Sequence, residues 1–334
     1  MDLIIRLLQH RLTHGVIEMK LWTGGIAHRS LMFIPSHLPK MLAKAMGFID
    51  PKYQSEGPRP DIIILDLEDS VPEDKKVAAQ ENVVAFLENV INMGQQGRPI
   101  VVRINALDKG GTEDLEAIRP FKNIHAVILS KTEAAWQLKQ VTKHMPPSAF
   151  LWPFIETPLS IMNLRDIIEA KASLGALLFG SQDMRADTGI PSSEADRPNP
   201  TTDTQKALII NAARTEGLMV FGGVCPQFRG AGLEIANRSA RRDYRAGFDG
   251  KLCIHPDQIP GIHKAFSPAA KEIEIANLVV AEAGDGGIGA IKVVIDGEPR
   301  MIERLHVKSY QETLAMAMAI ARNERALSCL DDAR

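Results

Sequence analysis

Cysteine is scarce in this chain, and its spacing is not that of a disulfide or zinc framework. Cys225, Cys253 and Cys329 are the only three in 334 residues, and they form neither a CxxC pair nor a zinc-ligand pattern. An odd, small number of cysteines favours reduced thiols in a cytoplasmic protein. The sequence therefore predicts no disulfide.

Long apolar runs and a dominant charge sign are also absent. No apolar run approaches the roughly 18 residues that a membrane-spanning helix needs, and Lys+Arg 39 against Asp+Glu 41 gives a formal net charge of −2. We therefore expect neither a membrane nor nucleic acid as a partner. Residues 1–23 lack the apolar segment and cleavage site of a signal peptide, and residues 1–27 are assigned to an N-terminal segment. They are expected to form an N-terminal arm or helix, with an organelle-targeting peptide as the alternative.

The chain does contain eight short apolar runs, each ending at a turn or polar residue. They are residues 31–34, 62–65, 100–102, 127–129, 150–155, 177–179, 219–221 and 251–254. Runs of this kind, separated by helical patterns such as 72–90 and 204–216, are typical of buried parallel strands. Eight of them predict an α/β fold, a (β/α)8 TIM barrel over residues 28–283.

A smaller segment follows the predicted barrel. Residues 268–283 are predicted to form a barrel helix, and the glycine-rich stretch 284–289 a flexible joint. Beyond the joint, Asp296-Gly297 separates two apolar runs, which is a hairpin signal, and a helical pattern covers residues 307–325. We therefore predict that residues 284–334 form a hairpin-plus-helix lid.

Two carboxylates follow neighbouring runs at the end where such a barrel carries its active site. Glu156 and Asp183 are 27 residues apart, one strand–helix unit, so they are expected to lie on adjacent strands. Adjacent carboxylates repel each other unless a cation or a shared proton neutralises them, and Mg²⁺ or Mn²⁺ suits such ligands. They form a candidate metal site. Pairing of each with Arg103 or Arg185 is the alternative.

Arg103 follows the third run and is the candidate for holding a substrate oxygen. A guanidinium there can grip a planar carboxylate or enolate by two parallel hydrogen bonds. Glu68 and Asp69 follow the second run. Ion pairing with them is the alternative role for Arg103, and the two roles can coexist. Arg103, Glu68 and Asp69 are taken as candidate catalytic residues.

A series of motifs, in order and at consistent spacing over residues 28–325, resembles the citrate lyase beta subunit family. The motifs are 29–35 (RSLMFIP), 67–71 (LEDSV), 103–105 (RIN), 131–133 (KTE), 155–158 (IETP), 179–183 (FGSQD) with Asp187, and 247–256 (GFDGKLCIHP). This family includes malyl-CoA and citramalyl-CoA lyases and belongs to the wider HpcH/HpaI aldolase superfamily of metal-dependent barrels. No single motif is specific, but the series is.

The resemblance implies a set of ligands and an assembly. It implies Mg²⁺ held by Glu156 and Asp183, a substrate carboxylate or carbonyl gripped by Arg103, and coenzyme A (CoA) thioesters as substrates. It also implies homotrimers or hexamers in which the lid of one subunit covers the site of the next. Lys40 and Lys44, one helical turn apart, are candidates for binding CoA phosphates, with an ordinary solvated helix face as the alternative.

Arg29 and His255 complete the candidate substrate-binding residues, although a hydrogen-bonded structural histidine is the alternative for His255. Lys131 and Glu133 are more simply explained as an ion pair near the barrel mouth than as Schiff-base chemistry. Three further positions depart from the family pattern. Glu303 stands where the family has an aspartate, Gln227 where an acid is common, and Ser36 where a glycine is usual.

Together with the family resemblance, these residues predict a Mg²⁺-dependent carbon–carbon lyase. It would cleave, or in reverse form, a malyl-CoA or citramalyl-CoA type thioester, giving a 2-oxo acid and an acyl-CoA. Glu303, delivered by the lid, would move the proton at the enolate carbon. One alternative is a class II aldolase acting on free 2-oxo acids. The other is a non-catalytic homologue that binds a metal and a CoA ester.

Overall fold

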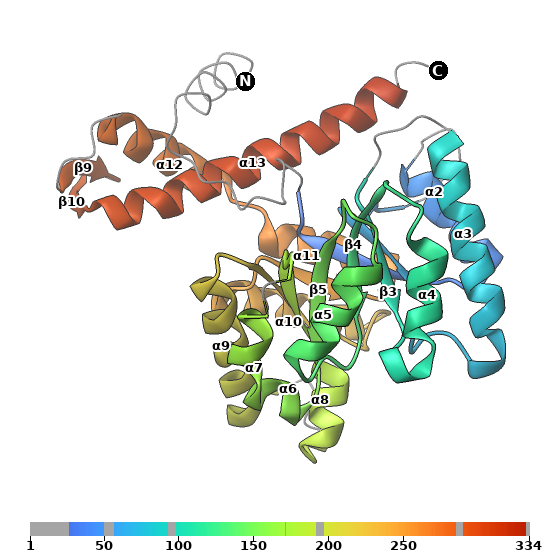
Figure 1. Ribbon diagram of the computed structural model, residues 1–334. Helices are drawn as coiled ribbons and strands as arrows, with labels where there is room; N and C mark the ends of the chain where they lie inside the picture. Colours follow the sequence, from blue (N-terminus) through green and yellow to red (C-terminus); the bar gives the residue numbers. More distant parts are fainter. Residues whose placement is uncertain are drawn as a thin grey trace. The chain divides into compact units, whose positions relative to one another are not determined.

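The computed structural model describes residues 27–49, 57–92, 98–170, 172–191, 197–284 and 290–331. The chain divides into two units, which are described separately. One is His28–Phe266, and the other contains Ser267–Arg334 (Figure 1). The predicted N-terminal arm, apart from Ala27, and most of the predicted glycine joint lie outside the described residues.

The unit His28–Phe266 is a closed barrel of eight parallel strands in chain order. The strands are β1 (Ser30–Pro35), β2 (Ile62–Asp66), β3 (Ile100–Ile104), β4 (Ile124–Leu129), β5 (Phe150–Ile155), β6 (Ala176–Phe179), β7 (Met219–Gly222) and β8 (Gly250–Cys253). Leu31 of β1 lies opposite both Ile62 of β2 and Leu252 of β8, and this pairing closes the barrel. The predicted (β/α)8 barrel is confirmed.

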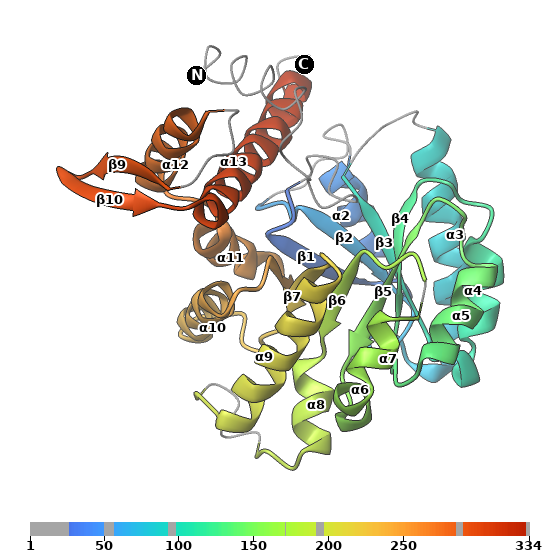
Figure 2. The same ribbon diagram turned by 60° about the vertical axis from the view of Figure 1, so that its left-hand side comes forward.

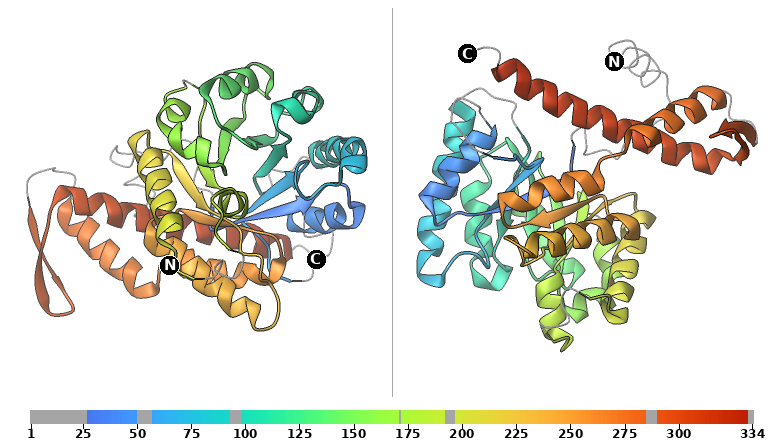
Figure 3. Two further views of the ribbon diagram at one scale, coloured as in Figure 1. Left: turned by 90° about the horizontal axis from the view of Figure 1, so that it is seen from below. Right: turned by 180° about the vertical axis from the view of Figure 1, so that it is seen from behind.

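Helices surround the strands, as the left view of Figure 3 shows. They are α2 (Pro39–Ile49), α3 (Lys76–Asn92), α4 (Gly111–Ile118), α5 (Ala135–His144), α6 (Pro158–Met162), α7 (Leu164–Ile168), α8 (Ser181–Asp187), α9 (Pro200–Thr215), α10 (Gly232–Ala246) and α11 (Ile259–Phe266), with short 3-10 turns at Glu73–Lys75, Leu107–Lys109 and Pro256–Gln258. Because helices cover the outer face and side chains fill the interior, the strands are apolar on both faces. All five residues of β2 are buried, for example.

The second unit contains α12 (Ala270–Ala283), the hairpin of β9 (Ile291–Ile295) and β10 (Glu298–Ile302), and α13 (Arg304–Asp331) (Figure 2). The predicted hairpin and helix are both present, and Asp296 and Gly297 have positive φ at its turn, as an Asp-Gly turn requires. Helix α12 packs on α13 and β9. The prediction that residues 268–283 form a barrel helix is therefore corrected, because the last barrel helix is α11.

Two smaller expectations can be compared with the structure. Cys225 and Cys253 are buried, and neither is part of a disulfide. Within the described part of the chain, no helix combines the length and apolar character needed to cross a membrane.

A buried ion pair lies at the amino-terminal end of the barrel strands. Arg29, just before β1, donates from Nε and Nη2 to the carboxylate of Asp61 at 2.8 and 2.9 Å, and Ser30 Oγ accepts from the Asp61 N–H at 3.0 Å. Burial raises the pKa of Asp61, but the hydrogen bonds and charge of Arg29 outweigh it, so the net shift is downward. This end is opposite to the strands' carboxyl ends. The position of Arg29 therefore does not match the substrate-binding role predicted for it.

Replacing Asp61 should destabilise the fold without touching the active site. Asp61→Asn removes the buried carboxylate that pairs with Arg29, so the free energy of unfolding should fall by about 3–5 kcal/mol at pH 7. The pKa of Asp61 in the folded state is below its ordinary 3.8, so the ion pair stabilises above that pH and is lost as pH falls through the folded value. Urea unfolding at pH 7 and pH 3 should show the difference between the proteins shrinking in acid. Equal stability at pH 7 would contradict this role.

Candidate active site

Three carboxylates meet at the carboxyl ends of the strands. One oxygen each from Asp69, Glu156 and Asp183 lies within 4.8 Å of the other two. Glu156 directly follows β5, Asp183 lies in the first turn of α8 after β6, and Asp69 lies in the loop after β2. The expected proximity of Glu156 and Asp183 is confirmed. The structure adds Asp69 to this carboxylate group.

Glu156 is the buried member of the group. Its side chain is fully buried, and burial raises its pKa to about 8 against the opposing effect of Lys131. Oε1 accepts the Lys131 N–H at 2.7 Å, whereas Oε2 finds no hydrogen-bond partner among the described residues. A buried oxygen without a partner is costly. A divalent cation would satisfy it, so the residues present fit a metal ion.

The charge balance of the site also favours a cation. When the five carboxylates described at the site are all ionised, they outnumber its three described basic groups by two charges. The acids are Asp66, Glu68, Asp69, Glu156 and Asp183, and the bases are Lys76, Arg103 and Lys131. Burial is also the main cause that raises the pKa of Glu68 to about 7. A divalent cation would balance this surplus and favour the ionised acids.

The position of Glu156 leaves no room for a side chain at Gly180. A Cβ added to Gly180 would lie 2.1 Å from the Glu156 Cβ and 2.9 Å from its Oε2. No side chain fits there unless the carboxylate moves. The glycine after β6 therefore allows a buried acid to stand at the end of β5.

Gly180→Ala should consequently displace Glu156 and weaken Mg²⁺ binding by about 10- to 100-fold, the usual cost of disturbing a ligand's support. Isothermal titration with MgCl₂ measures the effect. Gly261→Ala is the matched control, because its added Cβ would meet Asn237 Oδ1 on the outside of the barrel. Equal affinities in the two variants would contradict the role of Gly180.

Lys131 stands among the acids. Its Nζ contacts Asp183 Oδ1 and lies 3.8 Å from Glu156 Oε1. Its φ of 50° is uncommon for a residue with a side chain. The expected pairing of Lys131 with Glu133 is wrong, since Glu133 instead accepts from Thr157 Oγ1 at 2.8 Å. The ammonium group partly neutralises the carboxylates that are proposed to hold the metal.

Arg103 projects from β3 toward three carboxylates. Its Nε and Nη2 donate to the two Asp66 oxygens at 2.6 and 2.7 Å, and Nη1 lies 2.9 Å from Glu68 Oε2 and 3.3 Å from Asp69 Oδ2. Its Cζ lies 4.6 Å from the centre of the Phe33 ring. Burial lowers the pKa of Arg103, but these carboxylates raise it well above its ordinary value. The alternative of ion pairing with Glu68 and Asp69 is confirmed.

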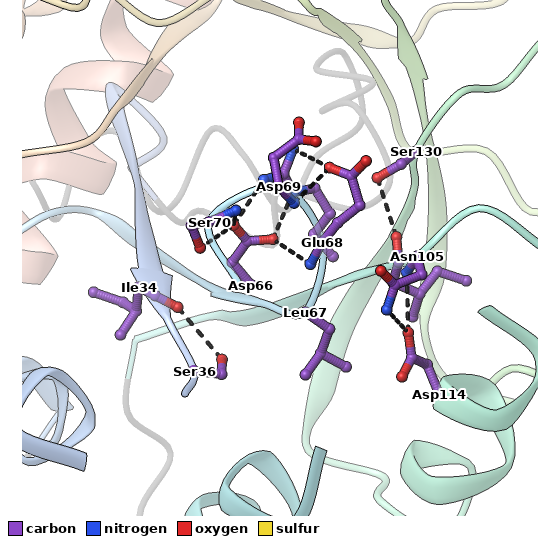
Figure 4. Close-up of polar contacts among 12 residues, drawn as sticks. Ile34, Ser36, Asp66, Leu67, Glu68, Asp69, Ser70, Asn105, Asp114 and Ser130 are labelled. Carbon is purple, nitrogen blue, oxygen red and sulfur yellow. Dashed lines mark hydrogen bonds and ion pairs between the residues drawn. The ribbon is translucent and has the colours of Figure 1, made fainter. Parts of the chain in front are cut away.

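Asp66 is a partner of Arg103 that the sequence analysis did not include among the candidate site residues. It lies directly opposite Arg103 in the β2–β3 register, and it also accepts from the Glu68 N–H at 3.0 Å and from Ser70 (Figure 4). Because Asp66 occupies the Nε–Nη2 edge of Arg103, a substrate carboxylate would meet the other edge, which now faces Glu68 and Asp69. An acid at the end of one strand and an arginine at the end of the next is the signal that could have found this pair.

Lys76 supports the loop that carries Glu68. Its Nζ donates to the carbonyl oxygens of Leu67 and Glu68 at 2.9 and 2.8 Å and to Asn105 Oδ1 at 2.7 Å. Asn105 is held in turn by Asp114, as Figure 4 shows. Nothing in the sequence distinguishes Lys76 from an ordinary helix lysine.

Four other residues considered in the sequence analysis have different surroundings. His255 stacks on Phe228 with 4.7 Å between ring centres, and its Nδ1 accepts from the Asp257 N–H. Lys40 is exposed in the first turn of α2. Arg185 donates to Gln182. Glu303 is exposed after β10 in the second unit, so its delivery to an active site stays a prediction.

Comparison with known proteins finds relatives along most of the chain. A family model described as HpcH/HpaI aldolase/citrate lyase matches residues 29–256. A (3S)-malyl-CoA thioesterase of Cereibacter sphaeroides (strain ATCC 17029 / ATH 2.4.9) is 34% identical over 300 residues, covering 88% of this chain and 95% of that protein. The mitochondrial citramalyl-CoA lyase of Homo sapiens is 28% identical over 318 residues, covering 88% and 87%.

Solved structures resemble the chain as well. The protein CitE from Mycobacterium tuberculosis, in complex with magnesium, acetoacetate and coenzyme A, matches with a TM-score of 0.66 and 26% identity. The match covers 88% of this chain and 99% of that one.

Proposed function

Because the chain belongs to the HpcH/HpaI aldolase/citrate lyase family, we propose that it is a Mg²⁺-dependent carbon–carbon lyase acting on a malyl-CoA or citramalyl-CoA type thioester. The observation that carries this proposal is the group of three carboxylate oxygens within 4.8 Å of one another, one of them from the buried Glu156. The products would be a 2-oxo acid and an acyl-CoA, and the reaction can run in either direction.

Glu156 and Asp183 would hold the metal, with Asp69 beside them. Mg²⁺, or Mn²⁺ in its place, would supply a Lewis acid that stabilises negative charge on the substrate's oxygens. Arg103 would bind the carboxylate of the 2-oxo acid through its Nη1 edge, in place of the contacts that this edge now makes with Glu68 and Asp69, and would fix its orientation. Asp66 would position Arg103 for this contact, since it already holds the opposite edge of the guanidinium.

The chemistry requires two proton movements. Loss of the proton from the C3 hydroxyl group lets the C2–C3 bond break, which leaves the 2-oxo acid and the enolate of the acyl-CoA. Glu68 and Asp69 are the barrel's candidates near the hydroxyl group, and Glu303 is the candidate that protonates the enolate at C2. This last role places the hairpin-plus-helix segment over a barrel, which in the predicted homotrimer or hexamer belongs to a neighbouring subunit.

Glu303→Gln should lower the rate of proton transfer at C2, by about 10²- to 10⁴-fold, while Mg²⁺ and acyl-CoA binding change little. Hydrogen–deuterium exchange at C2 of acetyl-CoA, followed by NMR, isolates this step. Mixing Glu303→Gln with Glu156→Gln subunits should regenerate some activity in mixed oligomers. Full activity of Glu303→Gln would exclude the role, and no recovery despite proven subunit exchange would exclude the shared site.

Thioester hydrolysis is the second candidate, because the 34% identical relative is named a (3S)-malyl-CoA thioesterase. Hydrolysis would use the same substrate class but would release a hydroxy acid and free CoA. The two candidates differ in which bond breaks, so product identity separates them. A class II aldolase would turn over substrates without CoA, whereas a non-catalytic homologue would bind ligands without turnover.

A thermal-shift screen tests the proposal at the level of binding. A ligand that binds only the folded state stabilises it by about 2.7 kcal/mol at 100 times its Kd. We expect glyoxylate or pyruvate to raise the melting temperature only when Mg²⁺ is present, and acetyl-CoA to add a further shift. A response to 2-oxo acids with none to acyl-CoA would favour the class II aldolase. No Mg²⁺-dependent shift would contradict the metal site.

A further inference from the structure

A pocket opens on the barrel unit between α8, α9 and α10. Its empty volume is about 670 Å³ when the open solvent at its mouth is included. Residues 223–226, which follow β7, form part of its wall. Ser181, Gln182 and Arg185 of α8 line it, whereas Asp183 of the carboxylate group does not. The pocket is therefore adjacent to the candidate metal site but is built from different side chains.

The pocket carries a surplus of positive charge. Among the described residues that line it, five cationic side chains outnumber two acidic ones by three charges, although the whole chain has a formal net charge of −2. The cations are Arg185, Arg197, Lys206, Arg242 and Lys251, and the acids are Asp203 and Asp243. Such a local surplus in a concave site attracts anions.

The base of the pocket contains two lysines around one aspartate. Lys206 Nζ lies 2.7 Å from Asp243 Oδ1, and Lys251 Nζ contacts Oδ2 and the carbonyl oxygen of Gly223. Lys251 is 3% exposed and Asp243 is 1% exposed. One carboxylate neutralises only one of the two ammonium groups, and a buried charge is costly unless it is compensated. An anion in the pocket would supply that compensation.

The remaining lining suits an oxygen-rich anion. Five neutral side chains that can donate hydrogen bonds also line the pocket, namely Ser181, Gln182, Asn199, Thr202 and Ser239, and the first two donate to the carbonyl oxygen of Val224. Guanidinium groups such as those of Arg185 and Arg242 match the geometry of phosphate oxygens. We propose that this pocket binds a phosphate-bearing ligand. The source would be either the phosphate groups of the CoA thioester or a free phosphate ester, and only the CoA source rests on the proposed function.

Binding of adenosine 3′,5′-bisphosphate and of inorganic phosphate, measured by calorimetry in Mg²⁺-free buffer, tests the pocket itself. We expect the full chain to bind the bisphosphate, and Arg185→Gln and Arg242→Gln each to weaken binding at least tenfold. Arg241→Gln is the matched control, because Arg241 is the exposed neighbour in α10 and pairs with Glu234. Unchanged affinity in both pocket variants, or no binding of either phosphate compound by the wild-type protein, would overturn the proposal.

The two sources are separated by competition. If CoA phosphates occupy the pocket, CoA should displace the bisphosphate, and the pocket variants should weaken CoA binding while leaving S-acetylpantetheine binding unchanged. If a free phosphate ester is the ligand, bisphosphate and CoA should bind together. Because these measurements require no turnover, their failure is distinct from failure of the proposed lyase activity.

Discussion

Glu156→Gln and Asp183→Asn should each abolish measurable Mg²⁺ binding and lower kcat/KM by about 10³-fold or more. Stabilisation by a Lewis acid contributes several kcal/mol to a transition state, and about 4 kcal/mol corresponds to 10³ in rate. Calorimetry and steady-state kinetics on folded variants measure both effects. Glu169→Gln and Asp166→Asn are the matched controls, since they remove the same charges at exposed positions of the nearby chain.

The same substitution of Glu156 should not harm the fold. The folded-state pKa of Glu156 is raised from 4.5 to about 8 by burial, so ionisation of this group costs stability above its ordinary pKa, and fully so above about pH 8. Without Mg²⁺ at pH 7, Glu156→Gln should be at least as stable as the wild type. A marked loss of stability, or wild-type Mg²⁺ affinity in both variants, would contradict the site.

Arg103→Lys should lose at least about 100-fold in activity although it keeps the charge. An ammonium group cannot reproduce the paired contacts of a guanidinium with Asp66 while also facing Glu68 and Asp69, and loss of charged hydrogen bonds worth about 3 kcal/mol corresponds to roughly 10² in rate. The KM for the 2-oxo acid in the condensation direction should rise. Unfolding should become easier by about 1–3 kcal/mol, because carboxylate oxygens lose partners.

Arg165→Lys is the control for Arg103→Lys, since Arg165 forms an exposed pair with Glu169 and should tolerate the change. A variant of Arg103 that is less stable but has unchanged kcat and KM would reduce this residue to a structural role. The stability and kinetic measurements together therefore distinguish a role of Arg103 in stabilising the loop from a role in binding the substrate.

The barrel could be predicted because its signal is local and repeated. Each strand is a short apolar run ended by polar residues, and the eight runs lie within two or three residues of the observed strands. The pattern of α12 is also local, but the same spacing suits a barrel helix and a helix that packs on a hairpin. Its placement depends on contacts with α13 and β9, which periodicity does not reveal.

The site could be predicted where chain position alone determines geometry. Glu156 and Asp183 follow adjacent strands, so the barrel brings them together. The partnership of Asp66 with Arg103 depends on strand register, and that of Lys131 with Asp183 depends on an unusual backbone conformation. Arg29 directly precedes β1, and this position in the chain alone places it at the amino-terminal end of the strands, opposite to the candidate site.

The identity of the products formed from (3S)-malyl-CoA tests the central claim most directly. The purified protein with MgCl₂ should convert it to acetyl-CoA and glyoxylate in equal amounts, measured by liquid chromatography and mass spectrometry, and EDTA should stop the reaction. Formation of malate and free CoA from the first time points, with no glyoxylate, would contradict the assignment of a carbon–carbon lyase.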